Sequence, residues 1–389
     1  MCVARSKEME NVYRADKDLG SQGVAIPGVG LATSAKPVMF QAPTQEALRS
    51  PGLGTSTLRV GVVGYGYWGP NVVRNFQFQE HSKVTMVCDS RPDARARVLQ
   101  HYPGVEVTGD ASAVTRSPNV DVVAVVTPVW THYDLAKEAL LNGKHVFVEK
   151  PFTSTTQQAE ELIELAERKN LTIMVDHTFL FTGAVRKIKE LIVAGELGTL
   201  YYYDSMRVNL GLFQHDVNVI WDLAPHDLAI MDYLLPGQPQ GLVASGATHV
   251  NGVEDIAFLT IYYPDHLIAH INVNWLSPIK VRTTLVGGKK KLLMWNDLEA
   301  DEKLKIYDKG VQTSTREGVY DLLVSYRSGD MWAPQVPNVE ALKLEIEHMN
   351  RCIMSGTTPI NDGQAGLRIV KMLEAANESL KHRGGEIHL

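Results

Sequence analysis

The sequence predicts a doubly wound parallel α/β sheet, followed by an α+β domain with a large open, mainly antiparallel sheet. The first observation is an alternation of short apolar runs with helical patterns over residues 58–178. The second is a change of pattern after residue 194, where apolar runs follow one another with turns and no helix between most of them. The third is a glycine-rich turn where the first strand meets the first helix.

The parallel part begins with Leu58–Val63, an apolar run into a glycine that is typical of a strand buried on both faces. A capping-box spacing of Ser154 and Gln157 precedes the last helix of this part. The other expected elements are strands at 84–88, 120–126, 145–148 and 171–175, and helices at 71–76, 94–101, 133–141 and 157–169.

The second part begins with a helix expected at residues 184–194, and two helices are expected at 342–353 and 367–380. The strands expected between them are residues 200–210, 242–250, 255–263, 267–275, 281–286, 291–295 and 304–307. Because consecutive strands without crossover helices pair antiparallel, this sheet is expected to be antiparallel.

The length of 389 residues allows two domains and a remainder, at roughly 100–200 residues per domain. Residues 1–57 mix Gly, Pro, Ser and scattered charges without a sustained period, so they are predicted to form a flexible N-terminal extension. We expect the parallel domain to span residues 58–178 and the second domain, with its C-terminal helices, to span 179–389.

The overall charge gives no reason to expect nucleic-acid or membrane binding. Thirty-eight Lys and Arg against 44 Asp and Glu leave a formal charge of -6. The 3 cysteines are far apart in the sequence, which favours a reducing compartment. No apolar stretch near the N-terminus is long enough for a membrane span, and no secretory signal is apparent, so a cytoplasmic protein is expected.

The glycine-rich turn reads Gly64-Tyr65-Gly66-Tyr67-Trp68-Gly69 and lies between a predicted strand and a predicted helix. In that context the pattern is typical of a Rossmann dinucleotide site, where a pyrophosphate meets the helix N-terminus. We therefore expect Gly64, Gly66, Tyr67, Trp68 and Gly69 to bind the cofactor.

An acidic residue follows at the expected offset. Asp89 ends the second predicted strand, 20 residues after Gly69, where a carboxylate bonds the ribose hydroxyls of NAD and repels the 2′-phosphate of NADP. Ser90 and Arg91 are expected to join it at the cofactor. NAD is therefore predicted, and Arg91 keeps NADP as a less favoured alternative.

Ligands of doubly wound sheets bind outside the carboxyl ends of the strands, so polar residues at those ends are candidates. Lys150 ends a buried strand, and its ammonium could stabilise an alkoxide beside a nicotinamide ring. The other strand-end candidates are Thr127, Pro128, His132 and Glu149 for the cofactor and His177 for the substrate.

A second constellation, Asp222 and His226, has the spacing that places two residues on one face of a helix. A carboxylate at that spacing can orient an imidazole that accepts a proton from a substrate hydroxyl. Pro225 suits the first turn of a helix, so a loop entering a helix is expected here. The nearby His and Asp residues lack a recognisable ligand spacing, and no metal is expected.

These motifs resemble the Gfo/Idh/MocA family of nicotinamide-dependent sugar and polyol oxidoreductases. The resemblance rests on GVVGYGYWG at 61–69, TPVWTH at 127–132, GKHVFVEKP at 143–151 and WDLAPHD at 221–227. It implies a Rossmann domain followed by a sheet domain commonly used for oligomerisation, hence a homodimer or homotetramer. It also implies that Lys150, Asp222 and His226 are catalytic.

The branch most similar to this sequence acts on nucleotide sugars and includes UDP-N-acetylglucosamine 3-dehydrogenases. Arg207, Asn209 and Asn218 precede the catalytic segment and are expected, with His177, to contact the substrate. The predicted reaction is NAD-dependent oxidation of a ring hydroxyl to a ketone, at C3 of a UDP-N-acetylhexosamine. The alternatives are a ketoreductase of a nucleotide-linked deoxysugar, an inositol or free-sugar dehydrogenase, and a non-catalytic NAD-sensing regulator.

Overall fold

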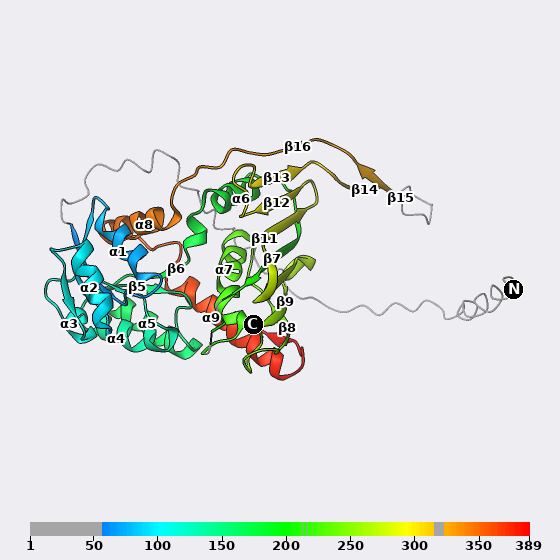
Figure 1. Ribbon diagram of the computed structural model, residues 1–389. Helices are drawn as coiled ribbons and strands as arrows, with labels where there is room; N and C mark the ends of the chain where they lie inside the picture. Colours follow the sequence, from blue (N-terminus) through cyan, green and yellow to red (C-terminus); the bar gives the residue numbers. More distant parts are fainter. Residues whose placement is uncertain (1–56, 212, 215, 315–322) are drawn as a thin grey trace, which may run out of the picture. The chain divides into compact units, whose positions relative to one another are not determined.

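The computed structural model describes residues 57–211, 213–214, 216–314 and 323–389 (Figure 1). Two large sheets organise these residues, one of six strands and one of nine, beside a two-stranded hairpin of β14 (Gly310–Ser314) and β15 (Leu323–Arg327). The predicted fold class is thereby confirmed. Apart from Thr57, the extension expected over residues 1–57 lies outside the described residues.

The six-stranded sheet has the order β3-β2-β1-β4-β5-β6, and all its pairings are parallel. Its central strands are valine-rich and buried, because helices cover both faces of a doubly wound sheet. The strands in spatial order are β3 (Glu106–Thr108), β2 (Ser82–Cys88), β1 (Leu58–Val63), β4 (Val122–Val125), β5 (His145–Glu149) and β6 (Ile173–Asp176).

Five helices accompany this sheet in chain order. They are α1 (Gly69–Gln77), α2 (Pro92–His101), α3 (Ala111–Thr115), α4 (His132–Leu141) and α5 (Thr156–Lys169). The short elements β3 and α3 were not predicted, because three to five residues carry too little periodicity. The cap of α5 is Thr155, whose hydroxyl accepts a hydrogen bond from Gln158 N, so the predicted capping box is displaced by one residue.

The nine-stranded sheet has the order β16-β13-β12-β11-β7-β10-β9-β8-β17. Its strands are β7 (Leu200–Leu210), β8 (Gly241–Ala247), β9 (Ile256–Tyr262), β10 (Ile268–Asn274), β11 (Leu276–Gly288), β12 (Leu292–Asn296), β13 (Leu304–Tyr307), β16 (Met331–Trp332) and β17 (Ile387–His388). The pairing is mainly antiparallel, as predicted, and the exception among the described pairs is β10, which pairs with β7 in parallel. The connection between those two strands contains a long helix and two further strands, so it is long enough to return the chain to the end of the sheet where β7 begins.

Helix α7 (Val219–Leu234) packs against β7, β9 and β10, and α6 (Gly183–Val193) packs against α7. Pro225 lies inside α7, six residues after its start, contrary to the expected loop. Because proline has no N–H, this position breaks one hydrogen bond of the helix without ending it. No helix among the described residues is long and apolar enough to cross a membrane.

The C-terminal segment returns to the six-stranded sheet (Figure 1). Helix α8 (Ala341–Ser355) packs against α1, and its Asn350 donates to Ser82 Oγ at 3.1 Å. Asn361, after α8, donates to the carbonyl oxygen of Val175 at 2.6 Å. Helix α9 (Gly363–Lys381) then contacts α5, α7 and β8, so it joins the two sheet regions.

Candidate active site

The glycine-rich turn connects β1 to α1, and its three glycines differ in how much space surrounds the position of a Cβ atom. Gly64 has φ 104°, and a Cβ there would lie 2.1 Å from the carbonyl oxygen of Val126. A Cβ on Gly69 would lie 2.4 Å from the carbonyl oxygen of Gly64. A Cβ on Gly66 would meet nothing within 4 Å, so protein packing does not require this glycine. Gly66 is therefore the position where bare backbone can approach a pyrophosphate.

Asp89, at the end of β2, is bound into the same turn. It is 8% exposed and accepts hydrogen bonds from the backbone N–H groups of Tyr65 (2.8 Å) and Arg91 (2.9 Å). The guanidinium of Arg91 adds two more, at 3.1 Å each. Burial alone would raise the pKa of Asp89, but these hydrogen bonds outweigh it and lower the pKa. Asp89 is thus an ionised acceptor beside the glycine-rich turn.

The other predicted cofactor residues surround the ends of β2 and β4. Ser90 is exposed beside Asp89, and Tyr67 is 91% exposed at the tip of the turn. Thr127 lies 2.6 Å from the hydroxyl of Thr131, which also donates to the Pro128 carbonyl at 2.8 Å. These side chains line the carboxyl edge of the parallel sheet, where a dinucleotide is expected.

His132 is buried beneath this edge and contacts the loops that follow β4 and β5. It is 1% exposed, with Nδ1 at 2.9 Å from the carbonyl oxygen of Pro151 and Nε2 at 2.7 Å from that of Thr127. Burial lowers its pKa. Its ring therefore fixes the loop after β4 to the loop after β5, and it would support a cofactor through those loops.

Lys150, directly after β5, meets the first turn of α7. Its Nζ donates to the carbonyl oxygen of Asp222 at 2.9 Å and lies 3.8 Å from the Oδ1 of the same residue. Asp222 Oδ2 accepts a hydrogen bond from the indole of Trp275 at 2.9 Å. The Lys150 and Asp222 side chains are 18% and 23% exposed, so both are largely shielded but remain accessible to a ligand.

His226 lies one turn further along α7, and its ring packs edge-on against Phe179 at 5.1 Å between ring centroids. Burial, with the charges of Lys150, Arg207 and Arg282, lowers its pKa well below the usual value. The imidazole is therefore neutral at pH 7 and can accept a proton.

The expected contact between Asp222 and His226 is replaced by others. Asp222 pairs with Lys150 and Trp275 instead, and His226 Nδ1 has no hydrogen-bond partner among the described residues. The side chain of Asp222 belongs to the first turn of α7 and is drawn toward the ammonium and the indole. Asp222 therefore orients the lysine more directly than the imidazole.

Arg207, predicted to bind substrate, is committed to a buried ion pair. Its Nε donates to Asp227 Oδ2 at 2.5 Å and its Nη2 to Oδ1 at 3.3 Å, with 4% and 3% of the two side chains exposed. Ser205 donates a further hydrogen bond to Asp227 at 2.7 Å. The guanidinium also lies over the ring of Phe179, 4.6 Å from its centroid. Arg207 therefore lies buried at the back of the site, where it packs against the ring of Phe179.

Breaking this ion pair is expected to cost stability. Asp227→Ala leaves the buried guanidinium of Arg207 without a counter-charge, so the free energy of unfolding falls by about 3–5 kcal/mol. The paired variant Arg207→Met with Asp227→Leu removes both charges and recovers most of that loss. Urea unfolding curves measure both variants. A loss below about 1 kcal/mol for Asp227→Ala would show that the pair is dispensable.

The remaining predicted substrate residues differ in burial and in hydrogen bonding. Asn218 is the N-cap of α7: its Oδ1 accepts from Trp221 N at 3.2 Å, and its Nδ2 donates to Glu254 and Asn377. Asn209 lies in β7 and is partly exposed. His177, after β6, is 2% exposed, and burial lowers its pKa to about 3. Asn218 is therefore engaged structurally, whereas Asn209 is accessible.

Two residues near the site were missed from the sequence. Trp275 binds the Asp222 carboxylate, and Arg282 lies 5.8 Å from the centroid of the Phe179 ring. The Nε of Arg282 is buried without a partner among the described residues. Both come from β10–β11 of the second sheet, and no local pattern in the sequence distinguishes them from other strand residues.

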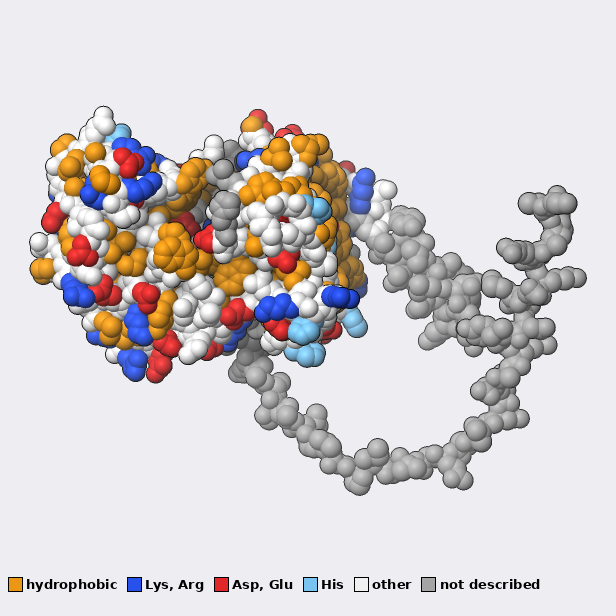
Figure 2. Space-filling view, turned by 60° about the horizontal axis from the view of Figure 1, so that its bottom comes forward, with side chains coloured by type: hydrophobic (Ala, Val, Ile, Leu, Met, Phe, Trp, Pro, Cys, Tyr) orange, Lys and Arg blue, Asp and Glu red, His pale blue; other side chains and the backbone are white. Residues whose placement is uncertain are grey.

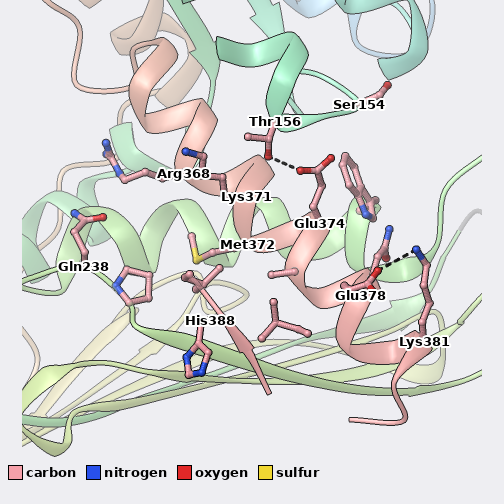
Figure 3. A pocket seen from close by; sticks show the side chains of 16 residues that line it. Ser154, Thr156, Gln238, Arg368, Lys371, Met372, Glu374, Glu378, Lys381 and His388 are labelled. Atoms are coloured by element: carbon pink, nitrogen blue, oxygen red, sulfur yellow. Dashed lines mark hydrogen bonds and ion pairs between the residues drawn. The ribbon is translucent and has the colours of Figure 1, made fainter. Parts of the chain in front are cut away.

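A pocket of about 720 Å³ lies away from these residues, between the start of α5, helix α9 and the C-terminal strand β17 (Figure 3). Its wall includes charged side chains that are already paired. Glu374 accepts a hydrogen bond from Thr156, and Lys381 lies 3.2 Å from Glu378. None of the residues predicted to be catalytic or to bind the cofactor lines it.

Two family models match the chain. The model described as "Oxidoreductase family, NAD-binding Rossmann fold" matches residues 58–177, and the "GFO/IDH/MocA C-terminal domain" matches residues 185–293. Together they span more than half of the chain. They confirm the family and the NAD cofactor predicted from the sequence.

Individual relatives agree with the family models. UDP-N-acetylglucosamine 3-dehydrogenase of Acidithiobacillus ferrooxidans is 26% identical over 322 residues, covering 80% of this chain and 94% of that protein. Its solved structure superposes with a TM-score of 0.71 over 84% of this chain and 98% of the other, at 23% identity. The scyllo-inositol 2-dehydrogenase (NADP(+)) of Bacillus subtilis is 25% identical over 355 residues, or 84% and 95% of the two chains.

A second solved structure, GenD2 from gentamicin A biosynthesis in complex with NAD, has a TM-score of 0.73 at 20% identity. The match covers 88% of this chain and 98% of that chain. This similarity shows that the whole described fold is shared with a protein that binds NAD. The chain therefore belongs to the Gfo/Idh/MocA family and is an oxidoreductase with an NAD-binding Rossmann domain.

Proposed function

We propose that this protein oxidises a secondary hydroxyl of a sugar ring to a ketone with NAD, and that its substrate is a UDP-N-acetylhexosamine oxidised at C3. The observation that carries the proposal is the meeting of Lys150 with the first turn of α7, one turn before His226, at the carboxyl edge of the parallel sheet. The resemblance to UDP-N-acetylglucosamine 3-dehydrogenase supports the substrate.

The residues present fit a dinucleotide. Gly66 leaves space for close approach, Asp89 is an ionised acceptor, and the N-terminus of α1 follows directly. We assign Gly64, Gly66 and Gly69 to the pyrophosphate and Asp89 to the adenosine ribose. When bound, NAD supplies a hydride acceptor at its nicotinamide ring.

The protein side chains then handle the hydroxyl. His226, neutral at pH 7, accepts the hydroxyl proton, and the ammonium of Lys150 stabilises the oxygen as it gains negative charge. Asp222 positions Lys150 through its carbonyl and carboxylate oxygens, and is itself held by Trp275. Asn209 is partly exposed, and the side chain of Arg282 is 31% exposed although its Nε is buried, so both can bind other parts of the substrate.

The test is a panel of substrates. UDP-N-acetylglucosamine, its uronic acid, scyllo-inositol and a thymidine diphosphate ketosugar are each incubated with the enzyme and the oxidised or reduced cofactor, and the absorbance of reduced nicotinamide is followed. We expect reduction of NAD with UDP-N-acetylglucosamine. Turnover of inositol alone would favour the second relative's chemistry, and NAD binding without turnover of any compound would favour a sensor.

Cofactor preference can be tested at Asp89. Asp89→Ala removes the ribose acceptor and releases Arg91, so kcat/KM with NAD should fall by roughly 10- to 100-fold while the value with NADP rises relative to it. The matched control is Asp89→Ala with Arg91→Ala, which lacks the freed guanidinium and should use both cofactors poorly. An unchanged NAD-to-NADP ratio in Asp89→Ala would contradict the assignment.

We also propose that copies of this chain associate through the open face of the nine-stranded sheet. Tyr202, Ile268 and Tyr262 are register neighbours across β7, β10 and β9, and each is 37–40% exposed. Met206 and Phe258 lie four residues further along the same face, each 40% exposed. Figure 2 shows hydrophobic side chains gathered on the side of this region that faces away from the parallel sheet. Such a surface favours a homodimer or homotetramer.

A further inference from the structure

Three carboxyl groups meet behind the glycine-rich turn. Glu149 ends β5 and is the register neighbour of Asp176, which ends β6. Glu345, from α8, is 0% exposed, and Asp176 is 2% exposed. Asn361 Nδ2 donates both to Glu345 Oε1 at 2.8 Å and to the carbonyl oxygen of Val175, directly before Asp176, at 2.6 Å, so Glu345 lies beside the end of β6. The mechanism above uses none of these three groups.

The donors around the three groups are too few for three carboxylates. Asp176 accepts from the indole Nε1 of Trp68 at 2.8 Å and from the hydroxyl of Thr178. Glu345 Oε1 accepts from Asn361 Nδ2 at 2.8 Å. The other oxygen of Glu345 is buried and has no donor among the described residues. A buried, unpartnered oxygen next to a second carboxylate is costly if both groups are charged.

A proton on Glu345 Oε2 would remove that cost and would turn the unpartnered oxygen into a donor that Asp176 could accept. The charged and titratable groups facing the pair are Glu149 and, beyond it, Lys150. Burial and the Asp176 charge raise the pKa of Glu345 well above its usual value. They raise the pKa of Glu149 in the same way, and there the charge of Lys150 opposes the rise. The protonated form of Glu345 is therefore favoured relative to an ordinary glutamate, and in that form it can donate to Asp176.

We propose that Glu345 is a positioning residue for the cofactor: in its protonated form it donates to Asp176, which fixes the indole of Trp68 and with it the glycine-rich turn. This rests on the proposed cofactor site at that turn. Trp68 lies between Gly66 and Gly69 and is the N-cap residue of α1, so a change in its position moves the backbone N–H groups that would face the pyrophosphate.

The same arrangement affects the charges around the Lys150 ammonium. Burial and the Asp176 charge raise the pKa of Glu149, which disfavours a second counter-charge directly before Lys150, in addition to that of Asp222. Helix α8 also has contacts that do not involve Glu345, because Glu340 binds Arg74 of α1 and Asn350 binds Ser82 of β2. Variants of Glu345 are therefore expected to keep α8 docked.

The test compares Glu345→Gln with Glu345→Leu by titrating NADH and measuring its Kd from fluorescence. Gln can donate to Asp176 as protonated Glu does and can accept from Asn361, so its Kd at pH 7 should equal that of the wild type. Leu cannot donate, and its Kd should rise about tenfold, as expected for loss of a hydrogen bond to a charged group. A wild-type Kd for Leu, or a Kd for Gln as weak as that of Leu, would overturn the proposal.

Two further measurements separate positioning from a merely structural role. Trp68→Phe keeps an aromatic side chain but removes the indole N–H, so its effect on Kd and that of Glu345→Leu should be less than additive. Additive effects would count against the network. As pH rises, loss of the Glu345 proton should weaken NADH binding in the wild type, and Glu345→Gln should weaken less over the same range. Identical pH profiles would also overturn the proposal, and this comparison holds even if the Leu variant does not fold.

One control distinguishes this inference from the proposed cofactor site. Gly66→Val places a side chain where the protein itself leaves space, so the chain should fold and NADH should not bind. If Gly66→Val binds NADH normally, the cofactor site is misplaced and the proposed function fails with it. If Gly66→Val abolishes binding while the Glu345 variants have no effect, only the role of Glu345 is refuted.

Discussion

Lys150→Met should lower kcat by about 10²- to 10³-fold and leave the Kd for NADH within a few-fold of the wild type. Methionine keeps the length and most of the volume of the side chain but removes the charge that stabilises the developing alkoxide. Lys150 Nζ reaches Asp222 rather than the glycine-rich turn, so its loss should affect chemistry more than cofactor binding. Steady-state kinetics with saturating NAD, together with an NADH titration, measure both quantities.

The control for Lys150 is Lys83→Met, which removes an exposed lysine from β2. It should leave kcat unchanged, because that ammonium is in solvent. Lys150→Arg is also informative, since it keeps the charge but replaces a compact ammonium with a planar fork. Turnover of Lys150→Met close to the wild type would remove Lys150 from the catalytic assignment.

His226→Asn should lower kcat by about 10²- to 10⁴-fold, because the substrate hydroxyl then has no general base. Asparagine can still form hydrogen bonds at this position, so substrate binding should change less than turnover. The matched control is His382→Asn, which alters an exposed histidine at the C-cap of α9. A kcat that stays within a few-fold of the wild type would show that the proton leaves by another route.

The pH dependence of kcat/KM tests the same assignment with a definite sign. The pKa of His226 is held below the 6.5 of an ordinary histidine, so the neutral base persists as pH falls through 6.5. Activity should therefore be retained at pH 6.5 and fall only at lower pH, as His226 takes up a proton. A fall centred near pH 7 in the wild type would indicate a different or a more exposed base.

The local features of the site were predictable because they lie within short stretches of sequence. The glycine turn and Asp89 are set by one strand, one turn and the next strand, and Lys150 follows directly from the end of a buried strand. The structure places them as that reasoning requires. The family resemblance then linked Lys150 to Asp222 and His226, which are 72 and 76 residues further on.

The partners of these residues were not predictable, since they come from distant strands and helices. Asp222 and His226 have the right spacing for contact, yet the carboxylate of Asp222 binds Trp275 and Lys150 instead. Arg207 looked like an anion-binding residue, but Asp227 neutralises it in the interior. The alternation of apolar residues in β10 identifies a strand, whereas its parallel pairing with β7 depends on how the intervening chain is routed.

The return of the C-terminal segment to the parallel sheet has a consequence for how this protein is made. A ribosome releases residues 58–178 long before α8 and Asn361, yet those late residues pack on α1 and satisfy the carbonyl oxygen of Val175 in β6. Residues 58–178 therefore lack these contacts until residues 341–361 have been translated. A ribosome stalled before residue 341 would therefore carry a Rossmann domain without helix α8 and without the hydrogen bonds from Asn350 and Asn361.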